Sequence, residues 1–167
     1  MSWHLLATMV SAVAVRYNTD EFKRPRTPSF IADSANALEM QPGPIEPSWV
    51  IDGNPQARSA FHSRAEDESG LTSVWDCTAG SFRWFFGWDE TVMILEGEVL
   101  VKAEDGTQRL LRAGDIAYFK GGSWATWHVE TYVRKIAFLR RPAPAPLAVL
   151  YRLRNRLRRS RPVGLAG

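Results

Sequence analysis

From residue 49 to residue 139 the chain alternates short hydrophobic, β-branched and aromatic runs with turn-forming residues. Such runs are typical of β-strands, and the segment Glu104-Asp105-Gly106 places glycine where a hairpin turn needs a positive φ. No helical period interrupts this region. The pattern therefore predicts strands near residues 49–51, 57–62, 73–77, 82–86, 90–95, 98–103, 108–112, 116–119, 125–129 and 133–139.

Many short strands without intervening helices predict an all-β antiparallel sandwich, jelly roll or barrel. Residues 17–48 mix charges with five prolines, so residues 1–48 are expected to form an N-terminal arm and an irregular lead-in. The alternating prolines and alanines of 142–146 suit an extended spacer, and the leucines after it recur at helical spacing. We expect a barrel over 49–142, followed over 143–167 by a spacer and a short basic amphipathic helix.

The composition limits the chemistry that the chain can carry. It has 167 residues, enough for one domain with flanking arms, and holds seven Trp and eight Phe but only three His. The single cysteine, Cys77, excludes an intramolecular disulfide and suits a reducing compartment. A cytoplasmic location is expected; export is the alternative, because the apolar run 3–15 ends in Ala12-Val13-Ala14, although it lacks a basic start.

Positive charge is concentrated at the C-terminal end. Residues 147–167 contain six arginines and no acid, so the rest of the chain is net acidic. This segment could bind an anionic membrane surface, a nucleic acid or an acidic partner, or it could pack on its own barrel or on a second subunit. No base-reading motif is present, so sequence-specific nucleic-acid binding is not expected. The arginines are Arg152, Arg154, Arg156, Arg158, Arg159 and Arg161.

Two separated motifs resemble the cupin signature. They are WFFGWDETVMILEG over 84–97 and AGDIAYFKGGSWATW over 113–127, and shorter stretches at 75–80 and 133–135 agree with them. The chain most resembles the subgroup named after the ureidoglycine aminohydrolase cupin domain. The resemblance implies a cupin jelly-roll barrel and a homodimer, and it offers a manganese-dependent hydrolase of a ureide carbon-nitrogen bond as one possible activity.

The resemblance also marks four metal-ligand positions. Counted from Gly97, the acidic position is Glu90 and the two positions before it are Trp84 and Phe86; in the second motif the remaining position is Ala125. Three of the four side chains cannot coordinate a cation. We therefore expect no bound metal and no other cofactor; if a cofactor is present, manganese is the expected one.

Residues two apart on a strand share one face, so Phe82, Trp84 and Phe86 should point into the barrel, as should Trp127 beside Ala125. Together with Glu90, these four aromatic residues are the predicted ligand-binding set. Desolvation should raise the pKa of Glu90, which could then act as a general acid or base or accept a hydrogen bond from a ligand. The alternatives are a structural Glu90 and aromatic side chains that simply fill the barrel.

Other polar residues receive plainer interpretations. His128 has the parity of an outward-facing residue, and Cys77 is interpreted as a buried thiol because no His is predicted beside it. Arg134 and Lys135 should point to opposite faces. Both are interpreted as surface charges; the alternative is that one of them reaches the rim of the pocket as an anion clamp.

Three functions follow from these observations. The first is a cupin that binds a small organic molecule in an aromatic pocket without a tightly bound metal. The second is the manganese-dependent hydrolase, and the third is a structural dimerisation module recruited by its basic tail. Whether the protein is an enzyme stays open at this level, because one fold hosts many chemistries.

Overall fold

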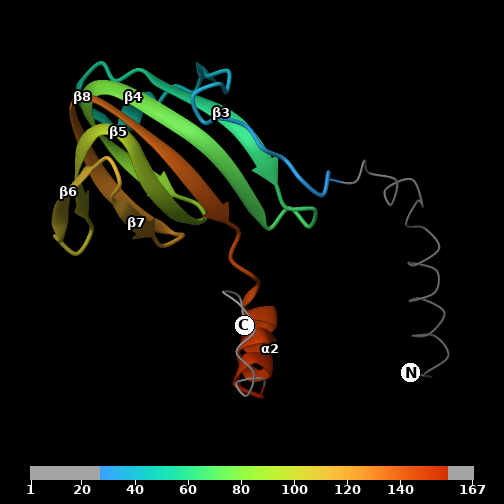
Figure 1. Cartoon of the computed structure of the whole chain (residues 1–167). Helices are drawn as coiled ribbons and strands as arrows, with labels where there is room; N and C mark the ends of the chain where they lie inside the picture. Colours follow the sequence, from blue (N-terminus) through green and yellow to red (C-terminus); the bar gives the residue numbers. More distant parts are fainter. Residues whose placement is uncertain (1–26, 158–167) are drawn as a thin grey trace, which may run out of the picture. The chain divides into compact units, whose positions relative to one another are not determined.

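The computed structural model describes residues 27–157, whose strands form one antiparallel sheet that curls into a jelly-roll barrel (Figure 1). No helix in this part of the chain is long and apolar enough to cross a membrane. The elements are β1 Gln41–Pro42, the 3-10 helix η2 Pro47–Trp49, β2 Val50–Gly53, β3 Ala57–Arg64, β4 Gly70–Phe86, β5 Asp89–Ala103, β6 Gln108–Arg112, β7 Ile116–Phe119, β8 Ser123–Arg140 and α2 Ala145–Leu157.

The strands follow the order β1-β3-β4-β8-β5-β6, with β2 paired to β4 and β7 paired to β5. The last strand, β8, lies between β4 and β5 and pairs with both over most of its length. Figure 1 shows these three long strands side by side around the interior. The all-β fold and the short C-terminal helix predicted from the sequence are confirmed.

Several predicted strand ends are wrong. Three pairs of predicted strands are continuous in the structure, as β4, β5 and β8, and the segments interpreted as breaks are β-bulges or plain strand. At Gly97 in β5, φ is +72° and an added Cβ would lie 2.0 Å from the carbonyl oxygen of Tyr132. Glycine is needed there because β5 approaches β8 closely while changing register, not because the strand ends.

The lead-in joins the sheet earlier than predicted. Strand β1 pairs with β3, and Ile45 is 5% exposed as part of the core. Pro42 suits an edge strand, which can dispense with one backbone N–H. The Arg134 guanidinium also donates a hydrogen bond to the carbonyl of Ala35. The apolar run 3–15 and the last three arginines lie outside the described residues.

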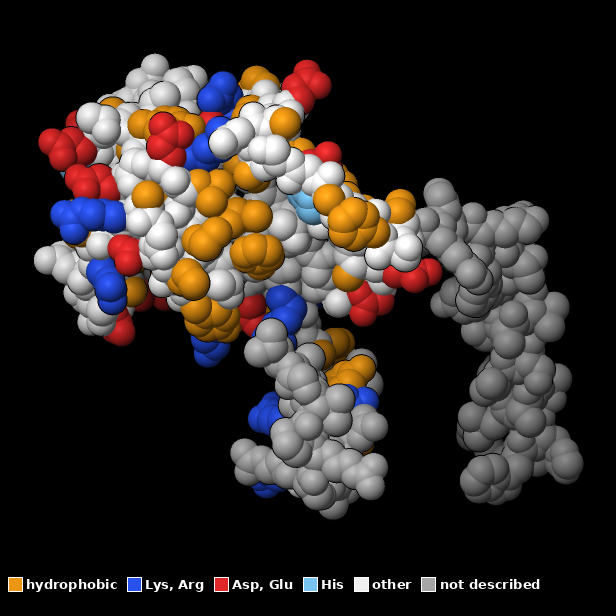
Figure 2. Space-filling model, viewed as in Figure 1, with side chains coloured by type: hydrophobic (Ala, Val, Ile, Leu, Met, Phe, Trp, Pro, Cys, Tyr) orange, Lys and Arg blue, Asp and Glu red, His pale blue; other side chains and the backbone are white. Residues whose placement is uncertain are grey.

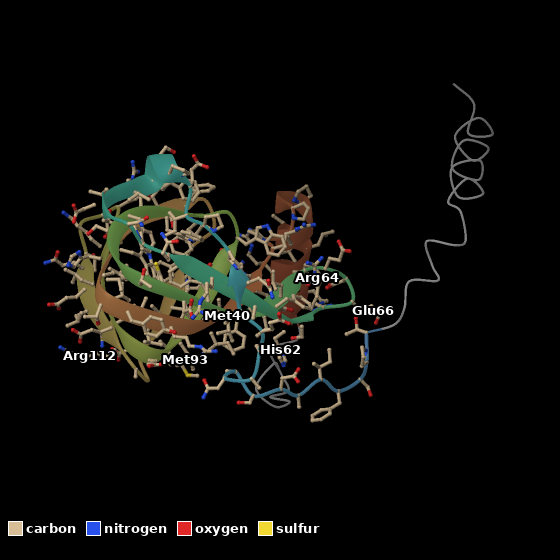
Figure 3. All side chains as sticks on the ribbon, turned by 90° about the horizontal axis from the view of Figure 1, so that it is seen from above. Met40, His62, Arg64, Glu66, Met93 and Arg112 are labelled. Atoms are coloured by element: carbon tan, nitrogen blue, oxygen red, sulfur yellow. The ribbon has the colours of Figure 1, made fainter. Side chains whose placement is uncertain are left out.

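The two faces of the sheet differ in use. The inner face forms one hydrophobic core, whereas apolar side chains of β5, β7 and β8 also gather on the outer surface (Figure 2). The exposed residues there include Ile116, Tyr118 and Phe138, and the register sets the first two beside Met93 and Thr91 of β5. Seen from above, Met93 and Arg112 lie on the outside of the curled sheet (Figure 3).

Candidate functional site

The interior of the barrel holds all five predicted site residues. Phe82 and Phe86 on β4 are 0% and 1% exposed, and Trp84 between them packs partly buried against the same core. Trp127 on β8 is 1% exposed, and its ring stacks on Phe82 with centroids 6.3 Å apart. The period of two in each strand therefore brings these aromatic rings together, as expected.

Trp75 also belongs to this cluster, although it was not among the site residues predicted from the sequence. Its ring lies edge-on or tilted to Phe82, Trp84 and Trp127, at centroid distances of 6.2, 5.9 and 6.0 Å. These are favourable aromatic geometries. Strand parity could have identified it, because Trp75 lies two residues before Cys77, which is fully buried on the same inner face.

A buried ion pair stands among these rings. The Nζ atom of Lys135 lies 2.7 Å from Oε1 of Glu90, and the two residues are 4% and 6% exposed. The same ammonium lies 4.5 Å from the ring centroid of Trp127 and 5.0 Å from that of Trp75. One carboxylate and two indole faces thus surround the cation, which offsets part of the cost of burying it.

The interpretation of Lys135 as a surface charge is wrong. Lys135 on β8 has the same parity as Ala125, Trp127 and Val133, and these residues are all buried in the core. Counting in twos from Ala125 would have placed Lys135 inside. Lys135 was predicted to be exposed because lysine is seldom buried without a partner. Arg134 does point to the opposite face, where it bonds to the lead-in.

One polar atom in this region has no partner. The indole Nε1 of Trp127 is buried and has no hydrogen-bond acceptor among the described residues. Buried N–H groups are nearly always paired, because leaving one unsatisfied costs about 1–3 kcal/mol. An oxygen atom of a ligand, or of an ordered water molecule, would supply the missing acceptor.

The aligned metal-ligand positions do not fit a metal ion. Ala125 is 3% exposed inside the barrel, and Trp84 and Phe86 share that interior, but none of the three offers a donor atom. Glu90, which could, is already paired with Lys135. Within residues 27–157, no group of three or more His, Cys, Asp and Glu side chains is arranged to hold a metal ion.

Cys77 and His128, the other residues considered for catalysis, lie in surroundings that do not activate them. Cys77 is 0% exposed, and burial raises the pKa of its thiol to about 12, with a smaller contribution from the charge of Asp76. A thiol held in its neutral form is a poor nucleophile. His128 faces outward as predicted, with its Nδ1 atom 2.7 Å from the Ser81 hydroxyl.

Asp76 has the parity of the outer face and has strong partners there. Arg58 donates two hydrogen bonds to its carboxylate, at 3.0 and 2.7 Å, and the Tyr132 hydroxyl donates a third at 3.0 Å. Burial, with the bond to Asp76, raises the pKa of Tyr132. This carboxylate is satisfied by its own neighbours and serves the sheet, not a ligand.

Asp89, the neighbour of Glu90, joins the start of β5 to the loop between β7 and β8 and to the end of β8. The backbone N–H of Gly121 donates to its carboxylate at 2.9 Å, and Arg140 donates at 2.5 Å. The Gly121 bond is the largest cause of a lowered pKa for Asp89, and Arg140 adds to it. The carboxylate thereby links β5 to the loop before β8.

The curled antiparallel sheet with this order of strands has the cupin jelly-roll fold. Residues 64–137, somewhat less than half of the chain, match the model of the EutQ-like cupin domain. The match does not single out the ureidoglycine aminohydrolase type that the motifs resemble. A comparison with curated proteins gave no match.

Solved structures share the fold. A protein of unknown function from Pseudomonas syringae pv. tomato is 26% identical over 62% of this chain and 45% of its own, with a TM-score of 0.57. This chain thus spans less than half of that relative. A predicted oxalate decarboxylase from Thermotoga maritima is 14% identical over 67% and 100% of the two chains, with a TM-score of 0.53. Fe(II)-HppE, solved with an alternative substrate, is 15% identical over 66% and 60%, with a TM-score of 0.52.

Proposed function

We propose that this protein binds a small organic molecule inside the barrel without the help of a metal ion. The observation that carries the proposal is the Lys135–Glu90 pair, buried among aromatic rings beside the unpartnered indole N–H of Trp127. Lys135 supplies the positive charge of the site, so a metal ion is not needed for that role. Glu90 supplies an acceptor, and Trp127 a donor.

The chemistry of these groups suggests a class of ligand. The aromatic rings of the interior are flat surfaces for the body of a ligand, and the unpaired indole N–H of Trp127 could donate to a carbonyl or carboxylate oxygen. Lys135 has been assigned one hydrogen bond, to Glu90, and can donate two more. A small molecule with an oxygen acceptor beside an N–H or O–H group, such as an amide, a ureide or a carboxylic acid, would match this set.

The first experiment asks whether such a molecule binds metal-free protein. The protein is dialysed against a chelator and screened by thermal shift with hydantoate, benzamide and benzoate. We expect at least one of them to raise the melting temperature, since a ligand that binds only the folded state stabilises it. Trp127→Phe should remove this shift, and Trp124→Phe, which keeps an aromatic ring at another position on β8, should retain it.

Two outcomes would overturn the proposal. One is that none of the probes binds, or that they bind Trp127→Phe and Lys135→Met as well as the wild-type protein. The other is about one equivalent of manganese or iron that survives dialysis and is lost in Glu90→Gln but kept in Glu98→Gln. That result would put the metal-dependent hydrolase first.

A further inference from the structure

Helix α2 exposes apolar side chains along one side. Val149, Leu150 and Leu153 are 49%, 61% and 50% exposed. Residues three and four apart lie next to one another on a helix, so these three form one continuous apolar strip. Tyr151 is 52% exposed on the neighbouring side.

Arginines border this strip. Arg152 and Arg156, four residues apart, line a shallow groove of about 180 Å³ together with Val149 and Leu153. Arg154 lies on the other side of the strip by helical geometry. Basic and hydrophobic side chains both show on the surface of α2 in Figure 2.

The charge around the helix has one sign. No Asp or Glu follows Glu130 in the sequence, whereas three further arginines follow α2. Long arginine side chains can keep their guanidinium groups in water while their stems cover apolar surface. The helix therefore presents an apolar strip with cations on both sides and no carboxylate to repel an anionic partner.

We infer that α2 docks in the plane of an anionic lipid surface. Such a surface has a negatively charged outer layer above an apolar one, and an amphipathic helix buries its apolar side roughly 5–10 Å into that boundary. The arginines would contact lipid phosphates, while Val149, Leu150 and Leu153 leave water. A nucleic acid would satisfy the arginines but leave the apolar strip exposed, so the lipid surface accounts for more of the helix.

The test uses the full chain and two kinds of vesicle, of phosphatidylcholine alone and of phosphatidylcholine mixed with phosphatidylglycerol. We expect flotation with the mixed vesicles only, with an affinity that falls steeply as salt is added, because the attraction is screened. Binding to both kinds alike, or to neither at low salt, would overturn the inference. Retention on a short RNA duplex without vesicle binding would assign the arginines to a nucleic acid instead.

Matched variants separate local contacts from net charge. Arg152→Gln with Arg156→Gln removes two charges from α2, and Lys102→Gln with Arg109→Gln removes two exposed charges from the barrel. We expect the first pair to weaken binding roughly tenfold or more and the second to have little effect, since a basic residue at the lipid surface contributes about fivefold. Leu150→Ser with Leu153→Ser should abolish binding at physiological salt. Equal losses in the two charge pairs would reduce the effect to general electrostatics and contradict docking by α2.

Discussion

The ammonium of Lys135 is 2.7 Å from the carboxylate of Glu90, the only donor among the four aligned metal-ligand positions. An organic cation is thus bonded to the carboxylate that would otherwise be free to coordinate an inorganic one. The pair is nearly neutral as a unit, which lets two charged groups stay among tryptophans in a hydrophobic core.

Breaking this pair from one side should be costly. Lys135→Met leaves a buried carboxylate without its partner and should lower the free energy of unfolding by about 3–5 kcal/mol. The double variant Glu90→Leu with Lys135→Met removes both charges and should come within about 2 kcal/mol of the wild type or exceed it. Urea denaturation measures the free energy of unfolding of each variant. The exposed pair Glu98–Arg112, with its atoms 3.1 Å apart, is the control, and its removal should cost under about 1 kcal/mol.

The two glycines Gly97 and Gly106 should respond differently to alanine. Both have positive φ, +72° and +85°, so each Gly→Ala change adds about 1–2 kcal/mol of backbone strain. Only at Gly97 does the new Cβ also meet the Tyr132 carbonyl, 2.0 Å away; nothing lies within 4 Å at Gly106. Thermal unfolding should therefore show a much larger loss for Gly97→Ala. Equal losses would mean that β5 and β8 separate easily at this bulge.

Cys77 should be unreactive in the folded protein. Its thiol is fully buried with a pKa of about 12, so neither access nor the thiolate form is available at mildly alkaline pH. Because the chain has one cysteine, a thiol reagent reports this site alone. We expect full labelling in urea and, in buffer, labelling only as fast as the barrel opens. Complete labelling within seconds in buffer would contradict the packing around Cys77.

Asp89 should contribute to stability in a pH-dependent way. Its pKa is lowered in the folded state, first by the Gly121 N–H, so its contribution is complete above the unfolded pKa of about 3.9. That contribution is lost as the pH falls through the folded pKa. Asp89→Asn should therefore be less stable at neutral pH and lose less stability on acidification. Urea unfolding across the acid range checks this, with the exposed Asp52→Asn as the control.

The fold could be predicted because strand parity and turn residues act locally. Alternation in twos brought Phe82, Trp84 and Phe86 to one face, and the resemblance to the cupin motifs marked Glu90 as an interior position. The ends of the strands were harder to predict, because a glycine in a β-bulge and a glycine in a turn look the same in a sequence. Gly97 differs from Gly106 only through the carbonyl of Tyr132, which is distant in the chain.

The polar part of the site needed three-dimensional positions. Parity alone places Lys135 inside, but only the reach of its side chain to Glu90 makes burial tolerable. The unpaired Nε1 of Trp127 depends on the direction of one ring and on every acceptor around it. No pattern along the chain encodes that geometry.

The central place of β8 also determines when the barrel can form during synthesis. Strands β4 and β5 both pair with β8, which follows them in the chain, so neither has its central partner until Arg140 has left the ribosome. Until then the aromatic face of β4 lacks its contacts with β8, such as the stacking of Phe82 on Trp127, and contacts this distant in sequence form slowly. We therefore expect a nascent chain stopped before Ser123 to remain incompletely folded and to bind chaperones.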